Sequence, residues 1–238
     1  MRIGIAGLGL VGGSLGLALR LHHDVIAFDP AGTGEIAAAE DLAGLLPAEL
    51  VIIATPLDTV VPTLAALAPL AGTAVLLDVG SVKREVARFA ETAPAAARIV
   101  GGHPMAGSTV SGLGAARADL FTGRPFLLIP TARSDDAAMA LAGEIARAVG
   151  AVPTVLSAEL HDRAVARLSG LPLLIARALA TAGAEFADLA GPGFTDMTRL
   201  AGTPKALAEA MLAGNADQIR VALREFRVTL DAAERELG

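Results

Sequence analysis

The stretch IGIAGLGLVG, residues 3–12, decides the fold of the amino-terminal half. A short apolar run leads into a G-x-G-x-x-G turn that opens a helical pattern. In such a unit the first glycine permits a tight turn, the second lets the backbone approach a pyrophosphate, and the third lets helix and strand pack closely. The phosphates would bind the N–H groups at the helix N-terminus. We therefore expect a dinucleotide site at Gly7, Leu8, Gly9, Leu10, Val11 and Gly12.

A second apolar run, residues 25–28, leads directly to Asp29. This is close to where a dinucleotide-binding unit carries its ribose-binding acid. A carboxylate there accepts hydrogen bonds from both ribose hydroxyls and would repel a 2′-phosphate, so we expect NAD as cofactor rather than NADP. Thr55 and Pro56 follow the next run and should line the same cofactor. The alternative is a purely structural role, in which Asp29 caps a loop and the other two form an ordinary turn.

Short runs rich in β-branched residues continue along the chain and alternate with helical patterns. Strands alternating with helices predict right-handed crossovers and a mainly parallel, doubly wound α/β sheet of the Rossmann type. The later runs are residues 75–77, 99–100, 126–129 and 152–155. We therefore expect a dinucleotide-binding domain over residues 1–155.

The sequence beyond residue 155 shows no further strand pattern. Ser157 is a candidate N-cap for a long helix that runs towards Leu189 and that Pro172 should kink. A Gly-Pro-Gly break at residues 191–193 should be followed by two more helices, the last over residues 215–237. This predicts a smaller all-helical domain over residues 156–238.

Composition excludes several classes of function. The 238 residues carry a net charge of −6 and no cysteine, so a basic nucleic-acid footprint, disulfides and thiolate metal sites are excluded. We expect no metal site and no nucleic-acid partner. The first residues lead directly into a glycine-rich turn, so we expect no signal peptide, and no uninterrupted apolar run reaches the ~18 residues that span a bilayer. A soluble cytoplasmic protein without a membrane partner is therefore expected.

One of the four histidines is placed for chemistry. His22 and His23 precede the second run and should be solvated turn residues. His103 follows an apolar run inside Gly-Gly-His-Pro-Met-Ala-Gly, and it is either a general base or a loop histidine bonded to backbone. Ser81 also follows a predicted strand, and it could cap a helix, bind a substrate hydroxyl or orient His103.

Several motifs in order make the chain resemble the prephenate and arogenate dehydrogenases of tyrosine biosynthesis over nearly its whole length. The most specific is the Gly-Gly-His-Pro-Met-Ala-Gly run. The motifs that carry the resemblance are residues 7–12, 78–83, 101–107, 161–162, 169–172 and 195–199.

This resemblance implies NAD-dependent oxidative decarboxylation of prephenate, arogenate or both, giving 4-hydroxyphenylpyruvate or tyrosine. Hydride would pass from ring C4 to the nicotinamide while His103 takes the hydroxyl proton, assisted by Ser81. Arg199 would bind a carboxylate of this small dicarboxylic substrate, and His161 and Ser169 are further substrate-binding candidates. The resemblance also implies a homodimer through the helical domain, with Arg199 as a candidate for serving the partner's site.

The chain departs from the family pattern in three places. The family usually has Ser-His-Leu-Pro-His where this chain has Ser-Gly-Leu-Pro-Leu, so Gly170 and Leu173 replace histidines. This leaves the choice between prephenate and arogenate open. The span between Asp29 and residue 51 is short for a crossover helix, which suggests a trimmed adenine side. We expect no carboxy-terminal regulatory domain, so any feedback by tyrosine would have to act at the active site.

Two other classes of function remain open from the residues. The first is a β-hydroxyacid dehydrogenase or imine reductase with the same layout; such enzymes often use a lysine from the helical domain. Only Lys83 and Lys205 exist here, and the histidine motif has no role in that scheme. The second is a non-catalytic nucleotide sensor, which the missing histidines bring into consideration.

Overall fold

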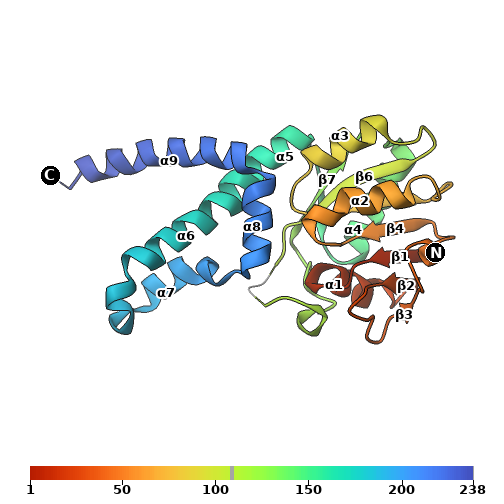
Figure 1. The fold of residues 1–238 in the computed structure, drawn as a ribbon, viewed down its shortest axis with the longest axis horizontal. Coiled ribbons are helices and arrows are strands. Elements are labelled where there is room, and N and C mark those ends of the chain that lie inside the picture. Colours follow the sequence, from red (N-terminus) through yellow and green to blue (C-terminus); the bar gives the residue numbers. More distant parts are fainter. Residues whose placement is uncertain (108–109, 238) are drawn as a thin grey trace. The chain divides into compact units, whose positions relative to one another are not determined.

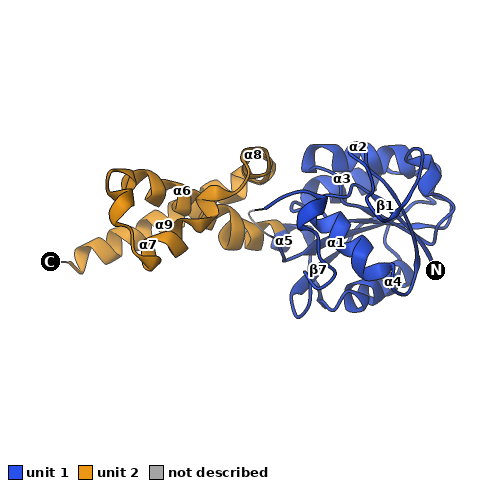
Figure 2. Ribbon diagram, turned by 90° about the horizontal axis from the view of Figure 1, so that it is seen from below, with its two compact units in different colours: residues 1–161 blue, residues 162–238 orange. Residues whose placement is uncertain are grey.

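The computed structural model describes residues 1–107 and 110–237, and the chain divides into two compact units. Unit 1 is Met1–His161 and unit 2 is Asp162–Gly238 (Figure 2). The division falls inside the helical segment that begins after residue 157, a few residues beyond the expected boundary at 155/156.

Unit 1 is built on one eight-stranded sheet in the order β3-β2-β1-β4-β5-β6-β7-β8. Every pair is parallel except the antiparallel pair β6–β7, which confirms the predicted mainly parallel α/β fold. The strands are β1 Arg2–Ala6, β2 Asp24–Phe28, β3 Ala37–Ala38, β4 Leu50–Ile53, β5 Val75–Asp78, β6 Arg98–Pro104, β7 Pro125–Pro130 and β8 Val152–Val155.

Helices cover both faces of this sheet (Figure 1). Helices α1 (Leu10–Leu19) and α4 (Asp136–Ala148) pack into one apolar cluster, and α2 (Leu57–Leu67) and α3 (Arg84–Thr92) pack into another. Neighbouring strand residues contribute to opposite clusters, because successive side chains of a strand point to opposite faces. The sheet is therefore doubly wound, as predicted.

The connection from β2 to β4 contains the two-residue strand β3 and the 3-10 turn η1, Ala43–Leu45. The sequence predicted no strand here, because two alanines carry no strand signal. β3 is nevertheless paired in parallel with β2. The short connection thus runs along the sheet edge in place of a crossover α-helix.

The carboxy-terminal segment is entirely helical in the residues described. Its elements are α5 Ala158–Val165, the π-turn η3 Ala166–Gly170, α6 Leu171–Ala182, η4 Ala184–Leu189, α7 Pro192–Thr198, η5 Arg199–Gly202, α8 Lys205–Gly214 and α9 Ala216–Arg235. The predicted N-cap is confirmed, because the Ser157 hydroxyl accepts a hydrogen bond from the Leu160 N–H at 3.2 Å. Just before Pro172, where the sequence predicts a kink, the helix contains a π-turn, and Pro172 has no N–H to donate to the turn before it.

The prediction of two helices after residue 193 was wrong. From residue 192 onward the described residues form three α-helices, α7, α8 and α9. The additional helix is α7, which begins at Pro192 inside the expected break. Proline suits the first helical position, since its fixed φ matches the helix and a backbone N–H at that position would have no partner within the helix.

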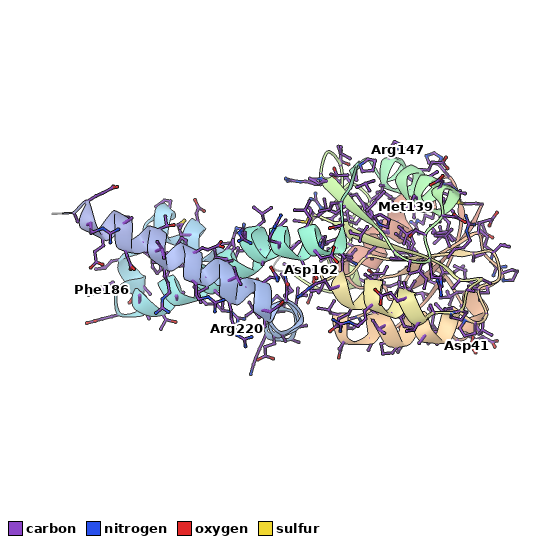
Figure 3. The ribbon with its side chains drawn as sticks, turned by 90° about the horizontal axis from the view of Figure 1, so that it is seen from above. Asp41, Met139, Arg147, Asp162, Phe186 and Arg220 are labelled. Atoms are coloured by element: carbon purple, nitrogen blue, oxygen red, sulfur yellow. The ribbon has the colours of Figure 1, made fainter. Side chains whose placement is uncertain are left out.

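In Figure 3, Phe186 lies at the far end of α6, and its side chain is largely exposed.

By length and composition alone, the helical segment Ala158–Ala182 could cross a membrane, with 33% of its most apolar window buried. A buried helix of a folded domain passes the same test. His161 and Asp162 near its start are fully buried, and the Asp162 carbonyl accepts a hydrogen bond from Asn215 at 2.7 Å. These polar contacts indicate that the helix packs against protein.

Candidate active site

Three neighbouring strands end in register at one edge of the sheet, and a fourth, β6, continues three residues further. Ala6 of β1 pairs with Ile53 of β4, which pairs with Asp78 of β5, which pairs with Gly101 of β6. Because these strands are parallel, whatever follows them gathers at the same edge, where open α/β sheets bind ligands. Adjacent strands lie ~4.8 Å apart, so the row extends over roughly 14 Å from β1 to β6. The predicted site residues that follow this row are Gly7, Gly9, Thr55, Ser81 and His103.

The glycine turn after β1 is shaped by close backbone approach. Gly7 has φ of 91°, which favours glycine, and a Cβ there would lie 2.7 Å from the Ala54 carbonyl oxygen. A Cβ on Gly12 would lie 2.0 Å from the Gly7 carbonyl oxygen. At Gly9, by contrast, an added Cβ meets nothing within 4 Å among the described atoms. The first and third glycines are thus required by the fold, whereas the second faces open space.

Asp29 is held against this turn by backbone donors. Its carboxylate accepts hydrogen bonds from the Leu8 N–H at 2.6 Å and from the Ala31 N–H at 2.8 Å. Each oxygen keeps a further lone pair with which it could bind a hydroxyl. The loop-capping and ribose-binding interpretations are therefore compatible. The Leu8 side chain is buried, so Leu8 acts on this site by fixing Asp29.

The start of α1 and the end of β4 supply the remaining polar groups. The first N–H bonded within the helix is that of Gly13, which donates to Gly9, so the earlier N–H groups of Leu10 and Val11 are those available to phosphate. The Thr55 Oγ1 is buried and makes no hydrogen bond to any residue described. An open Gly9 and an unsatisfied hydroxyl on the same edge fit a bound dinucleotide. Pro56 is exposed and precedes α2.

His103 lies at the end of β6, paired with Leu127 of β7. A Cβ on the preceding Gly102 would lie 2.8 Å from the Asp78 carbonyl oxygen, so β6 and β5 approach closely just before the imidazole. His103 is half-buried, and its Nδ1 lies 2.9 Å from Nε2 of His161. The structure thus brings two of the predicted site residues into direct contact.

Ser81 lies in the turn between β5 and α3 and is half-buried. The helix-capping interpretation of Ser81 was wrong, because α3 begins at Arg84 and Lys83 occupies the N-cap position. The Ser81 hydroxyl makes no hydrogen bond to a residue that the structure describes. Its assignment as a catalytic residue stays a prediction.

A buried ion pair beneath this edge was missed by sequence reasoning. Lys83 Nζ contacts the Asp78 carboxylate, and both side chains are fully buried. Asp78 also accepts a hydrogen bond from the Gly80 N–H at 2.7 Å. A Cβ on Gly101 would lie 3.2 Å from Lys83 Cδ, so this glycine leaves room for the lysine stem. Lysine is seldom buried unless it is paired, and the acid five positions earlier was the available signal.

A segment that follows the histidine motif packs on the glycine-rich helix. The Arg117 N–H donates to the buried Ser14 hydroxyl at 3.0 Å. A Cβ on Gly13 would lie 2.6 Å from Leu113 Cδ1, and one on Gly34 would lie 3.0 Å from Leu113 Cδ2. Leu113 therefore bridges α1 and the β2–β3 loop, and Gly13, directly after the G-x-G-x-x-G turn, was the sequence signal for this contact.

The remaining candidates lie in unit 2. Arg199 begins η5 and is exposed, with no ion pair to a described residue. Ser169 is half-buried in the π-turn. A Cβ on Gly170 would lie 2.6 Å from Ile219 Cδ1, and Leu173 is buried. The two positions at which the resembling family has histidine are thus filled here by apolar packing.

His22 and His23 precede β2 and therefore lie at the opposite edge of the sheet. His22 is exposed, but His23 is half-buried, so the expectation that both are solvated was wrong for His23. Burial lowers the pKa of His23, helped by the positive amino terminus and by His22. Neither side chain can take part in chemistry at the other edge.

A doubly wound sheet with a fixed glycine turn, an anchored acid and a histidine on one edge is the arrangement of a dinucleotide-binding dehydrogenase domain. Comparison with known protein families agrees with this assignment. Residues 31–155 match the family model for the nucleotide-binding domain of prephenate dehydrogenase, and residues 157–238 match that for its dimerization domain. The chain belongs to the prephenate dehydrogenase family.

Individual relatives extend this result. Prephenate dehydrogenase of Bacillus subtilis is 32% identical over 90% of this chain, and the chain spans 64% of that relative's length. The crystal structure of Synechocystis arogenate dehydrogenase matches with a TM-score of 0.83 at 31% identity, covering 98% of this chain and 90% of that one. Aquifex aeolicus prephenate dehydrogenase, solved with hydroxyphenyl propionate and NAD+, shares the fold with a TM-score of 0.88 at 24% identity. The match covers 100% of this chain and 90% of that one.

Proposed function

We propose that the protein catalyses the NAD-dependent oxidative decarboxylation of prephenate, arogenate or both. The observation that carries this is the register of β1, β4, β5 and β6, which gathers the glycine turn and His103 on one edge. Membership of the prephenate dehydrogenase family supports the choice of substrate class.

The chain's own residues supply binding, alignment and one proton acceptor. His103 takes the proton of the ring hydroxyl, and the turn at Ser81 provides a hydroxyl to hold that same group. Arg199 is suited to a carboxylate because its guanidinium is exposed and forms no ion pair with a described residue. Ser169 remains a candidate for substrate contact, whereas the His161 side chain is fully buried and contacts His103 instead.

The proton and the electrons balance without a further reactant. The ring C4–H bond breaks as the hydroxyl proton passes to His103. The C–C bond to the ring carboxylate then breaks, carbon dioxide leaves, and the ring becomes an aromatic phenolate, which takes the proton back from His103 to give the phenol. Bound NAD+ supplies the acceptor for the hydride. Aromatisation makes this sequence effectively irreversible, so the protein's main task is alignment.

Asp29 is the residue that we propose to select NAD. Its carboxylate is fixed next to the glycine turn by the Leu8 and Ala31 N–H groups, so it cannot swing away from an added phosphate. Gly9 and Thr55 would hold the phosphates and the adjoining ribose. Under this proposal NADP is the poorer cofactor.

We further propose that the protein acts as a cytoplasmic homodimer built through unit 2. The family model that matches residues 157–238 is described as a dimerization domain. Unit 2 exposes large apolar side chains on most of its helical segments, including Phe186, Leu189, Met197 and Leu230. A second copy would cover such a surface.

The test is a side-by-side assay of the purified chain with each acid and each nicotinamide cofactor. We expect reduced nicotinamide and carbon dioxide to form together with NAD and at least one of the two acids. Absence of turnover with both acids, in a protein that binds NAD, would contradict the proposed activity. A preference for NADP would contradict the role given to Asp29.

A further inference from the structure

His103 shares one of its ring nitrogens with a second imidazole. Its Nδ1 lies 2.9 Å from Nε2 of His161, and the ring centroids are 5.1 Å apart with the planes tilted by 58°. The rings are therefore not stacked, and the distance is that of a hydrogen bond between two ring nitrogens.

Both rings are held by the elements that carry them. His103 is fixed by strand pairing in β6 and by the close approach of Gly102 to β5. His161 lies in the first turns of α5, where its N–H donates to the Ser157 carbonyl at 2.9 Å, and its side chain is fully buried. The contact joins two parts of unit 1 that are 58 positions apart in the chain.

A hydrogen bond between two neutral imidazoles needs one proton between the facing nitrogens. In one arrangement His103 carries its proton on Nδ1 and donates to His161, which leaves a lone pair on His103 Nε2. In the other, His161 donates, and the proton of His103 must then be on Nε2. Only the first arrangement lets His103 accept a proton from a substrate hydroxyl.

We propose that His161 is a positioning residue that fixes His103 as the Nδ1–H tautomer. This rests on the proposed function, because it explains how His103 can act as the base. His161 accepts from His103 Nδ1 with its own proton on Nδ1, and His103 Nε2 is then the atom that takes the substrate's proton. When His103 becomes charged, the same contact becomes a charge-assisted hydrogen bond.

The role is one that a carboxylate often performs for a catalytic histidine. In unit 1 the buried acid nearest to β6 is Asp78, and its carboxylate is already paired with Lys83 and bonded to the Gly80 N–H. The Lys83 stem lies against Gly101, two residues before His103 on the same strand face. The imidazole of His161 therefore takes the orienting position.

Two variants and one spectrum test the proposal. His161→Leu removes the acceptor, and we expect turnover to fall by about 100-fold, within the range known for lost general-base function and wrong tautomers. His161→Gln keeps a carbonyl oxygen as acceptor, and we expect turnover at least about tenfold above that of the leucine variant. NAD affinity and the unfolding temperature of each variant serve as controls for folding.

The ¹⁵N spectrum of the imidazoles reads the tautomer without any substrate. Only four histidines need assignment, which the His103→Asn and His161→Leu variants provide. We expect His103 in the unaltered protein to carry its proton on Nδ1. A proton on Nε2, full turnover in His161→Leu, or a glutamine variant as inactive as the leucine variant would each overturn the proposal. Because the spectrum needs no turnover, failure of the proposed activity would show separately.

Discussion

The two units of this chain bury their apolar residues to very different extents. Unit 1 holds two apolar clusters, one on each face of its sheet, with central strand residues such as Ile5, Ile52 and Leu77 fully buried. Unit 2 buries only a few apolar residues, including Leu173, Ala208 and Ile219, and exposes larger ones. The comparison indicates that unit 1 has a complete core of its own, whereas unit 2 needs a further surface.

The largest expected effect tests the completeness of unit 1. Lys83→Met would leave the buried Asp78 carboxylate without its cation, so the free energy of unfolding should fall by about 3–5 kcal/mol. Chemical denaturation measures this. Arg20→Met breaks the exposed pair with Glu35 and should cost less than about 1 kcal/mol. Equal losses in the two variants would show that the buried pair has no special role.

A second prediction concerns turnover at the edge of unit 1. His103→Asn should reduce turnover by roughly 100-fold or more, the usual contribution of a general base, while NAD still binds. Steady-state kinetics and calorimetric titration with NAD measure the two effects. The matched control is His22→Asn, an exposed change at the opposite edge of the sheet, which should leave both unchanged. Full activity in His103→Asn would remove this residue from the mechanism.

A third prediction separates the roles of two glycines of the G-x-G-x-x-G turn. Gly12→Ala puts a Cβ 2.0 Å from the Gly7 carbonyl oxygen and should cost about 1–3 kcal/mol of stability by overpacking. Gly9→Ala has open space around it, so it should cost less stability yet weaken NAD binding by about tenfold or more. Thermal unfolding and NAD titration distinguish the two. If Gly9→Ala binds NAD normally, phosphate does not approach that position.

The fourth prediction tests the incompleteness of unit 2. Leu230→Glu places a charge on the exposed apolar side of α9 and should weaken dimerisation by about tenfold or more. Sedimentation equilibrium measures the dissociation constant. Leu70→Glu, at a similarly exposed leucine of unit 1, is the control and should leave the dimer intact. A monomeric unaltered protein, or two variants that behave alike, would contradict the proposed interface.

The smallest expected effect is a pH dependence within unit 1. The hydrogen bond from Arg98, followed by that from the Ala138 N–H, holds the pKa of Asp135 below its ordinary value of 3.8. The stability it contributes is therefore complete above that value and is lost as the pH falls through the lower pKa of the folded state. Asp135→Asn and Arg98→Met should both make the free energy of unfolding less dependent on pH in this acidic range. If the free energy of unfolding of both variants falls with acid as it does in the unaltered protein, the assignment is contradicted.

Local patterns made much of unit 1 predictable. The β-branched runs marked seven of the eight strands, and the glycine turn, Asp29 and His103 were read from position and residue type. Strand β3 was not predicted because two alanines bear no strand signal. Helix α7 was not predicted because Gly-Pro-Gly is typical of a break, although proline also suits the start of a helix.

The contacts that matter most at the site depend on tertiary packing. His103 and His161 meet only because β6 and α5 are brought together by the fold. The burial of Lys83 and the packing of Ile219 against Gly170 likewise join residues whose spacing gives no periodic signal. Single-sequence patterns report local backbone preferences, so they identify candidate groups but not their partners.

The most direct test of the central claim follows a deuterium atom. The claim is that the edge formed by β1, β4, β5 and β6 aligns a nicotinamide with the ring carbon whose hydroxyl faces His103. Substrate labelled with deuterium at ring C4 should give reduced nicotinamide that carries one deuterium, measured by mass spectrometry. Unlabelled reduced nicotinamide, or aromatic product formed without any reduced cofactor, would contradict the account.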